Sequence, residues 1–267
     1  MIKSFKKDNL AVKVYSTREE LGRAAALETG KKIMELQKNQ QMINIIFAAA
    51  PSQNEFLENL VSQEGIEWEC INAFHMDEYI GLPATAPQGF GNFLKERIFD
   101  LRPFHSVNYL NGQCESKEAE CNRYGQLLAA NPVDIVCMGI GENGHIAFND
   151  PHVADFNDKA QVKVVELDAL CRQQQINEGC FTTLAKVPTH ALTVTIPTLI
   201  KARYIFCMVP GRNKAQAVAN TIEQEITERY PSTILRNHQS AILFIDTQSA
   251  GLLKSNIGQH QKMENYN

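Results

Sequence analysis

The sequence has no long apolar run, no excess of basic residues and no paired cysteine motif. No stretch approaches the roughly 20 apolar residues of a membrane span, and the first residues are polar, so we expect neither a signal peptide nor a membrane anchor. This favours a cytoplasmic location. A formal net charge of −4 offers no basic field for nucleic acid or for an anionic membrane. Any anionic ligand must therefore be held by a few individually placed cations.

The seven cysteines form no recognisable pattern. They are odd in number and scattered, and none belongs to a Cys-x-x-Cys pair, which argues against both a disulfide framework and a zinc site. Cys137 and Cys207 stand inside apolar runs and are predicted to be small buried hydrophobic residues. We therefore expect no structural metal.

No Gly/Ser-rich linker, internal repeat or charge block divides the 267 residues. The composition, 44% hydrophobic and 21% charged, is typical of a globular protein with a full core. We predict one α/β domain over residues 1–254, followed by a polar tail at 255–267.

Apolar runs of strand length alternate with helix-like segments along the chain. Some are continuously hydrophobic, such as Ile45-Ile-Phe-Ala-Ala-Ala50, which is typical of parallel strands covered on both faces. Thr17-Arg-Glu-Glu20 and Ser52-Gln-Asn-Glu55 resemble capping boxes that open helices. The pattern predicts a doubly wound, mainly parallel sheet. The predicted strands are 43–50, 68–74, 133–140, 162–167, 191–196, 203–209 and 241–246, and the helices are 17–38, one from 52, 90–100, 117–130 and 213–223.

Four polar residues, His75, Asp77, Glu78 and Tyr79, follow the second predicted strand. Ligands in such folds gather at the carboxyl ends of the strands, where a carboxylate such as Asp77 can act as a general base. A solvated acidic loop is the plainer alternative. His75-x-Asp77 also resembles half of a metal site, but no third and fourth ligand follow at a recognisable spacing.

Residues 139–144 match the Gly-x-Gly-x-x-Gly dinucleotide fingerprint after a predicted strand. A dinucleotide site needs a helix directly after the third glycine, whereas His145-Ile-Ala-Phe-Asn-Asp-Pro151 ends any helix within two turns. We therefore predict no nicotinamide cofactor. Gly139, Gly141 and Gly144 instead indicate a turn that lets the backbone approach a ligand closely.

The same segment brings an imidazole and several amide and carboxylate groups together: Asn143, His145, Asn149 and Asp150. The ordinary pKa of histidine lies near neutrality, so His145 at a strand edge is a candidate proton shuttle. A purely structural histidine is the alternative at this stage.

Candidate groups for a phosphate are spread along the chain. Arg172 and Lys214 could supply positive charge, although either could also be an ordinary surface cation. Ser52 and Gln53 open a predicted helix after a strand, and free backbone N–H groups at a helix N-terminus bind phosphate. A simple N-cap is the other interpretation of Ser52.

In order and spacing, several motifs resemble the glucosamine-6-phosphate deaminase (isomerase) family, which is related to the 6-phosphogluconolactonases. They are Met76-Asp-Glu-Tyr79, Gly139-Ile-Gly-Glu-Asn-Gly-His-Ile-Ala-Phe-Asn149, Val187-Pro, Ala191-Leu-Thr-Val194 and Gly211-Arg-Asn-Lys-Ala215. The resemblance covers roughly residues 15–250. It implies a three-layer Rossmann-like fold, no metal and no cofactor, and conversion of glucosamine 6-phosphate to fructose 6-phosphate and ammonia.

The resemblance also implies roles for individual residues. Asp77 matches the carboxylate that moves a proton between C2 and C1, and His145 matches the acid/base of ring opening. Lys214, Arg172 and Ser52 match phosphate-binding positions. Family members are commonly oligomers, so a homo-oligomer is compatible with the resemblance.

Three departures from the family pattern bear on the substrate. Asn143 replaces a frequent aspartate and Asp150 a frequent glutamate, and an amide can orient a neighbour but cannot take up a proton. The glycine-rich Thr-Gly-Gly-Thr-Pro type of turn is here Ala49-Ala-Pro-Ser-Gln53. Alternatives are therefore a galactosamine-6-phosphate deaminase, a lactone hydrolase of the 6-phosphogluconolactonase type, or a non-catalytic sugar-phosphate sensor.

Overall fold

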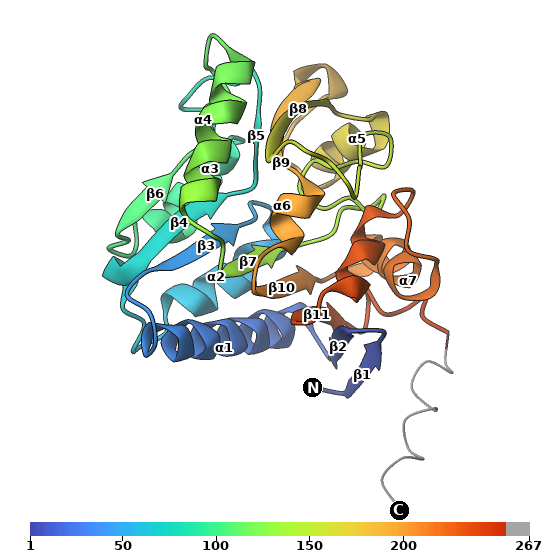
Figure 1. Cartoon of the computed structure of the whole chain (residues 1–267). Helices are drawn as coiled ribbons and strands as arrows, with labels where there is room; N and C mark the ends of the chain where they lie inside the picture. Colours follow the sequence, from blue (N-terminus) through green and yellow to red (C-terminus); the bar gives the residue numbers. More distant parts are fainter. Residues whose placement is uncertain (255–267) are drawn as a thin grey trace, which may run out of the picture.

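The computed structural model describes residues 1–254, and the predicted polar tail at 255–267 lies outside this part. An eight-stranded sheet forms the centre (Figure 1). Its strands are β1 (Lys3–Lys7), β2 (Leu10–Tyr15), β3 (Ile43–Phe47), β4 (Ile71–His75), β6 (Ser106–Asn108), β7 (Ile135–Met138), β10 (Tyr204–Val209) and β11 (Ala241–Asp246). Their order is β1-β2-β11-β10-β7-β3-β4-β6. Every neighbouring pair except β1 and β2 is parallel, which confirms the predicted mainly parallel sheet.

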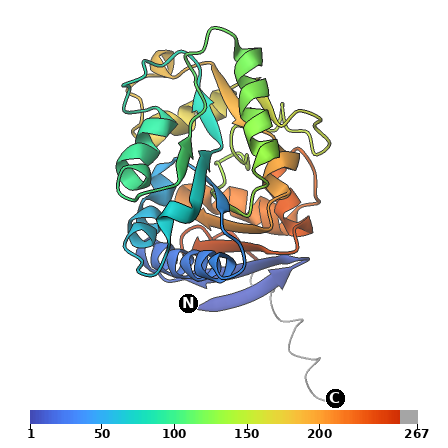
Figure 2. The same ribbon diagram turned by 60° about the vertical axis from the view of Figure 1, so that its left-hand side comes forward.

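Helices cover both faces of this sheet, which explains the continuously hydrophobic strands. Alternate side chains of a strand enter different cores: Ile46 and Val136 pack in one, and Ile45 and Cys137 in the other. Figure 2 shows α1 below the central strands of the sheet. The second core contains α1 (Arg18–Gln37), α2 (Asn54–Val61), α3 (Phe90–Leu94) and the π-helical turn η3 (Lys95–Phe99). The first contains α4 (Lys117–Ala130), α6 (Ile196–Ile200) and α7 (Ala215–Glu223).

A second sheet lies above the large one in Figure 1. It is antiparallel and has the order β5-β9-β8, formed by β5 (Asp77–Tyr79), β9 (His190–Val194) and β8 (Val162–Glu166). The predicted strands at 162–167 and 191–196 exist, but they pair here and not in the large sheet. The chain passes from β4 through Met76 directly into β5, so this small sheet begins at the carboxyl edge of the large one.

Several predicted boundaries shift. Thr17 caps α1 as predicted, because its Oγ1 accepts a hydrogen bond from the Glu20 N–H at 3.3 Å. The capping box at Ser52 is wrong: a 3₁₀ turn, η1 (Pro51–Gln53), precedes α2, and neither element has a side-chain cap. Glu55 instead pairs with Arg18 at 2.6 Å.

Short 3₁₀ turns move two further predicted element starts to later residues: η2 (Trp68–Cys70) precedes β4, and η5 (Arg212–Lys214) precedes α7.

Strands β1, β2 and β6 were not predicted. β1 and β6 each contain one apolar residue among polar ones, and Lys13 interrupts the apolar residues of β2. All three lie at or next to an edge of the sheet, so they lack the continuous hydrophobic run of the central strands.

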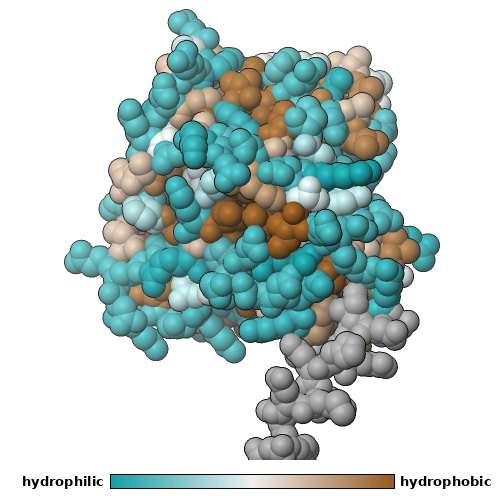
Figure 3. Space-filling model, turned by 45° about the vertical axis from the view of Figure 1, so that its right-hand side comes forward, coloured by the Kyte–Doolittle hydropathy of each residue, from teal (hydrophilic) through white to brown (hydrophobic). Residues whose placement is uncertain are grey.

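On the face drawn in Figure 3, hydrophilic residues cover most of the surface, and a band of hydrophobic residues lies across the middle. Within residues 1–254, no helix combines the length and the apolar character that a bilayer span requires. The predicted burial of Cys137 and Cys207 is confirmed. Both side chains pack between the sheet and its covering helices.

Candidate active site

Four loops follow the carboxyl ends of β10, β7, β3 and β4, which are consecutive strands of the large sheet. Together with α3 and α5 (Ala169–Asn177) they enclose a cavity of about 360 Å³, within the usual range for small-molecule sites. The predicted site residues in its wall are Ser52, Asp77, Gly139, Gly141, His145 and Lys214. All six follow strands that end at this edge of the large sheet.

Asp77 is the first residue of β5 and only 6% of it is exposed, yet it faces the cavity. Among residues 1–254, no hydrogen bond or ion pair to its carboxylate is found. Burial raises the pKa of this carboxyl well above its ordinary value, and the negative charge of Glu78 adds to the shift. A carboxyl with a raised pKa exchanges protons nearer to neutral pH than an ordinary aspartate does.

The neighbours of Asp77 are structural. Glu78 accepts hydrogen bonds from three backbone N–H groups, at 2.9 Å from Tyr79, 3.0 Å from Phe90 and 2.9 Å from Gly91, and so fixes the start of α3. His75 is fully buried, and its Nε2 accepts from the Leu110 N–H at 2.8 Å. Burial lowers the pKa of His75 to about 4, so its ring stays neutral. His75 faces the protein interior and adds no group to the cavity.

No helix follows Gly144, so the dinucleotide interpretation fails structurally as predicted. The loop reverses by tight turns, with Gly144 at φ +87° and Ala147 at φ +48°. Alanine in this left-handed region is strained, and such strain is often found at functional sites.

Gly141 lies directly against the ring of His145. A Cβ atom at this position would stand 2.2 Å from both Cε1 and Nε2 of the imidazole. Only glycine therefore permits the observed ring position.

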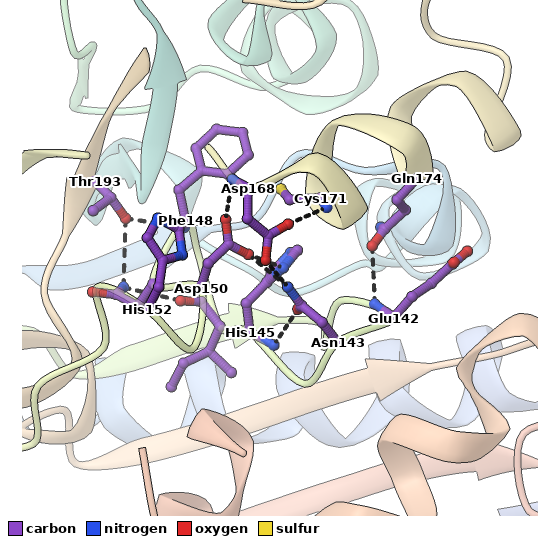
Figure 4. Close-up of polar contacts among 12 residues, drawn as sticks. Glu142, Asn143, His145, Phe148, Asp150, His152, Asp168, Cys171, Gln174 and Thr193 are labelled. Carbon is purple, nitrogen blue, oxygen red and sulfur yellow. Dashed lines mark hydrogen bonds and ion pairs between the residues drawn. The ribbon is translucent and has the colours of Figure 1, made fainter. Parts of the chain in front are cut away.

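His145, in the cavity wall, forms a close pair with Asp150, which does not line the cavity (Figure 4). The imidazole Nδ1 lies 2.8 Å from Asp150 Oδ1, a distance that allows charge pairing, although the ring N–H is not aligned for a hydrogen bond. Asp150 is fully buried and 8% of His145 is exposed. The carboxylate therefore stabilises positive charge on the imidazole.

Asn143 positions this pair, as the sequence suggested. Its Nδ2 donates to Asp150 at 2.9 Å and to Asp168 at 3.1 Å, and its Oδ1 accepts from the His145 backbone N–H at 3.0 Å. Burial alone would raise the pKa of Asp150, but the charge of His145 and the hydrogen bonds that the carboxylate accepts outweigh it, so the pKa is lowered. Asp150 thus stays ionised beside the imidazole. Asn149 is structural, since its amide donates to the backbone oxygens of Ile146 and Val194.

Lys214 lies in the turn η5 after Gly211, whose φ of +95° redirects the chain at the end of β10. Only 3% of Lys214 is exposed, and it faces the cavity. Its ammonium lies 3.2 Å from Glu178 Oε1.

The other predicted phosphate groups have different positions. Ser52 faces the cavity, whereas Gln53 is buried behind it and donates to Ser52 Oγ at 3.1 Å and to the Met208 carbonyl oxygen at 3.3 Å. Arg172 does not line the cavity. Its guanidinium donates to the carbonyl oxygens of Leu184 at 2.7 Å and Val187 at 2.9 Å, which ties α5 to the following loop.

Several polar residues of the site were missed from the sequence, among them Arg97, Glu178 and Asp168. Arg97 lines the cavity from the turn η3, where its Nε donates to Asn54 at 3.0 Å. Glu178 follows α5, and Asp168 caps this helix by accepting from the Cys171 N–H at 2.6 Å. The spacing of Asp168 before an apolar–polar segment is an N-cap signal that could have located the start of α5.

Two groups of possible metal ligands lie beside the loop among residues 1–254: His145, Asp150 and Cys171, and Asp150, His152 and Asp168. Neither includes His75 or Asp77, so they do not complete the half-site considered from the sequence. Asp150 is common to both groups, and its carboxylate already accepts from Asn143. We assign no metal to either group.

Comparison with known proteins identifies the family. A family model described as glucosamine-6-phosphate isomerases/6-phosphogluconolactonase matches residues 16–244. The chain belongs to this family. The resemblance predicted from the motifs is thereby confirmed.

Curated relatives named glucosamine-6-phosphate deaminase include one from Streptococcus sanguinis, 33% identical over 231 residues that cover 85% of this chain and 96% of the relative. One from Bacillus cytotoxicus is 36% identical over 192 residues, covering 72% and 71%. A solved structure described as a monomeric glucosamine-6-phosphate deaminase of the NagB superfamily matches with a TM-score of 0.81 and 31% identity, over 90% of this chain and 99% of that one.

A 6-phosphogluconolactonase from Thermotoga maritima has a TM-score of 0.73 at 16% identity, over 89% of this chain and 99% of that one. At this identity the match shows a common fold alone. The three-layer Rossmann-like architecture implied by the family resemblance is therefore confirmed.

Proposed function

We propose that this member of the family converts glucosamine 6-phosphate to fructose 6-phosphate and ammonia, by aldose–ketose isomerisation and deamination. The observation that carries the proposal is the Asp77 carboxyl, which is buried, has a raised pKa and faces the same cavity as His145, with no hydrogen bond or ion pair among residues 1–254. The relatives of 31–36% identity that are named glucosamine-6-phosphate deaminase support this reaction. The lactonase matches, such as the one at 16% identity, support only the fold.

Asp77 is proposed to move the proton between C2 and C1 of the opened sugar. As a carboxylate it removes the proton from C2, which gives an enolamine, and as the resulting acid it returns the proton to C1. One group can perform both steps efficiently when its pKa is close to the working pH. Protonation at C1 leaves an imine at C2; water adds to this carbon, and ammonia leaves as the C2 carbonyl of fructose 6-phosphate forms.

His145 is proposed to open the pyranose ring by moving a proton from the O1 hydroxyl to the ring oxygen O5. The ionised Asp150 stabilises the imidazolium that forms during this transfer, and Asn143 keeps the carboxylate in place. The roles resemble those in other His–Asp pairs, where the carboxylate orients the ring and does not itself take the proton.

The phosphate is proposed to bind to Lys214 and Ser52, which both line the cavity, with Arg97 as a second cation in its wall. This assignment replaces Arg172, whose guanidinium is used by two backbone carbonyls outside the cavity.

A cytoplasmic location and a homo-oligomer remain predictions from the sequence.

Replacing Asp77 by asparagine tests the reaction. The amide keeps the shape but cannot accept a proton, so we expect kcat for ammonia release from glucosamine 6-phosphate to fall by about 10²–10⁴-fold. Asp158→Asn is the matched control, because it removes a carboxylate that pairs with Lys163 outside the cavity. Wild-type turnover by Asp77→Asn would contradict the proton-transfer role.

Assays on three substrates separate the alternatives. Higher kcat/KM for galactosamine 6-phosphate, or hydrolysis of 6-phosphogluconolactone in place of ammonia release, would reassign the substrate. Tight binding of glucosamine 6-phosphate without any ammonia at high enzyme concentration would indicate a non-catalytic sensor.

A further inference from the structure

The cation predicted to bind phosphate is already paired with a carboxylate of the protein. Lys214 Nζ lies 3.2 Å from Glu178 Oε1, and both residues line the cavity. The side chain of Lys214 is 4% exposed and that of Glu178 is 11% exposed, so water screens this pair only weakly. The ammonium group that a substrate phosphate would need is therefore already paired with a carboxylate of the protein.

A network of hydrogen bonds holds Glu178 in this position. Gln174 Nε2 donates to the same Oε1 at 2.8 Å, and Gln174 Oε1 accepts from the Glu142 N–H at 2.9 Å. Glu142 in turn accepts from Asn213, the neighbour of Lys214, at 2.9 Å. These hydrogen bonds join three segments around one carboxylate: the end of α5, the loop after β7 and the turn η5. Glu178 is therefore held beside Lys214 and is not a free surface side chain in chance contact with it.

The Lys214–Glu178 pair reduces the attraction of the cavity wall for a dianion. The wall carries the carboxyl groups of Asp77 and Glu178, the basic side chains of Lys214 and Arg97, and the imidazole of His145. Arg97 is partly engaged by Asn54. In a partly desolvated site, a phosphate next to the Glu178 carboxylate meets repulsion that cancels part of its attraction to Lys214.

We propose that Glu178 is a specificity-determining residue that competes with the substrate phosphate for Lys214. Phosphate binds when Glu178 releases the ammonium, and the carboxylate lowers the preference of the site for phosphorylated over unphosphorylated amino sugars. The catalytic readout of this inference rests on the proposed deaminase function. The competition for Lys214 does not.

Glu178→Gln tests the proposal, because the amide retains an oxygen that can accept from Gln174 but carries no charge. We expect the ratio of kcat/KM for glucosamine 6-phosphate to that for glucosamine to rise at least tenfold, mainly through a lower KM for the phosphorylated sugar. A tenfold change corresponds to about 1.4 kcal/mol. An unchanged or lower ratio would overturn the proposal and leave Glu178 as a residue that only orients Lys214.

Two further variants complete the experiment. Glu28→Gln is the control, because it also breaks a lysine–glutamate pair, with Lys13 at 2.6 Å, but outside the cavity, and its substrate ratio should equal that of the wild type. Glu178→Ala removes the carboxylate without adding an amide, and it should shift the ratio in the same direction even where Glu178→Gln folds poorly.

Binding of inorganic phosphate, measured by calorimetry, tests the competition without catalysis. Glu178→Gln should bind phosphate at least tenfold more tightly than the wild type. Tighter phosphate binding without ammonia release by either protein would refute the proposed function and support the role of Glu178. Ammonia release from glucosamine 6-phosphate with equal phosphate binding by both proteins would support the function and refute that role.

Discussion

Gly141→Ala should disable the enzyme by displacing His145 while leaving the fold intact. The new methyl carbon would stand 2.2 Å from two ring atoms and 2.4 Å from Nδ1. Ordinary contacts of a Cβ begin at 3.4 Å, so the imidazole must retreat by about 1.2 Å. Its charge contact with Asp150, now 2.8 Å, lies on the same ring and shifts with it.

The expected loss follows from this displacement. A misplacement of about 1 Å in a catalytic group can cost about 10²-fold in rate, so we expect kcat to fall by about two orders of magnitude. The added methyl also overpacks a buried loop, which costs about 1–3 kcal/mol of unfolding free energy. The phosphate is proposed to bind to Lys214 and Ser52 and not to His145, so KM should change less than kcat.

The assay is steady-state ammonia release together with thermal unfolding. Gly125→Ala is the matched control: the glycine lies within α4, and the nearest atoms to the added methyl would belong to the Gln161 side chain, with Oε1 at 3.1 Å and Cβ at 3.4 Å. Alanine favours a helix over glycine, so this variant should remain active and at least as stable. A folded Gly141→Ala protein with wild-type kcat would refute the requirement for this ring position.

Two further predictions concern charge. Asp77→Asn should raise the melting temperature at pH 8, by about 2–4 °C for each 1 kcal/mol of burial cost that it removes. A carboxyl with a raised folded-state pKa contributes its full stability below its unfolded pKa of about 3.9 and loses it as the pH rises, so the gain in melting temperature should vanish near pH 4. An equal gain at both pH values would contradict the burial argument. Lys214→Ala should raise KM for glucosamine 6-phosphate at least tenfold, because a buried cation at the proposed phosphate site is lost. The same variant should have a lower melting temperature, because Glu178 keeps a poorly exposed charge without its partner. An unchanged KM would place the phosphate elsewhere.

Local patterns in the sequence predicted the frame of this site well. The central strands were found because both of their faces are buried, which produces continuous apolar runs, and parallel strands end at one edge. Asp77, Gly139, Gly141, His145 and Lys214 all follow such strands, and all five line one cavity. The motifs at these positions also sufficed to predict the family, which the comparisons confirm.

Interpretations that depended on side-chain partners were less secure. The capping box at Ser52 was wrong because a 3₁₀ turn displaced the start of α2 and Glu55 found Arg18 instead. Arg172 was assigned to phosphate from its charge, but its guanidinium binds two carbonyl oxygens of its own loop. Neither partner is visible in the spacing of residues.

The sequence by itself thus determined which loops meet at the edge of the sheet and which acid and base they bring there, because strand burial and glycine turns leave periodic, local signals. Only the tertiary structure decided what faces Lys214. Glu178 lies 36 positions earlier in the chain, and the path of α5 over the cavity brings the two side chains together. Such a contact depends on how separate elements pack against one another, and no local pattern records it.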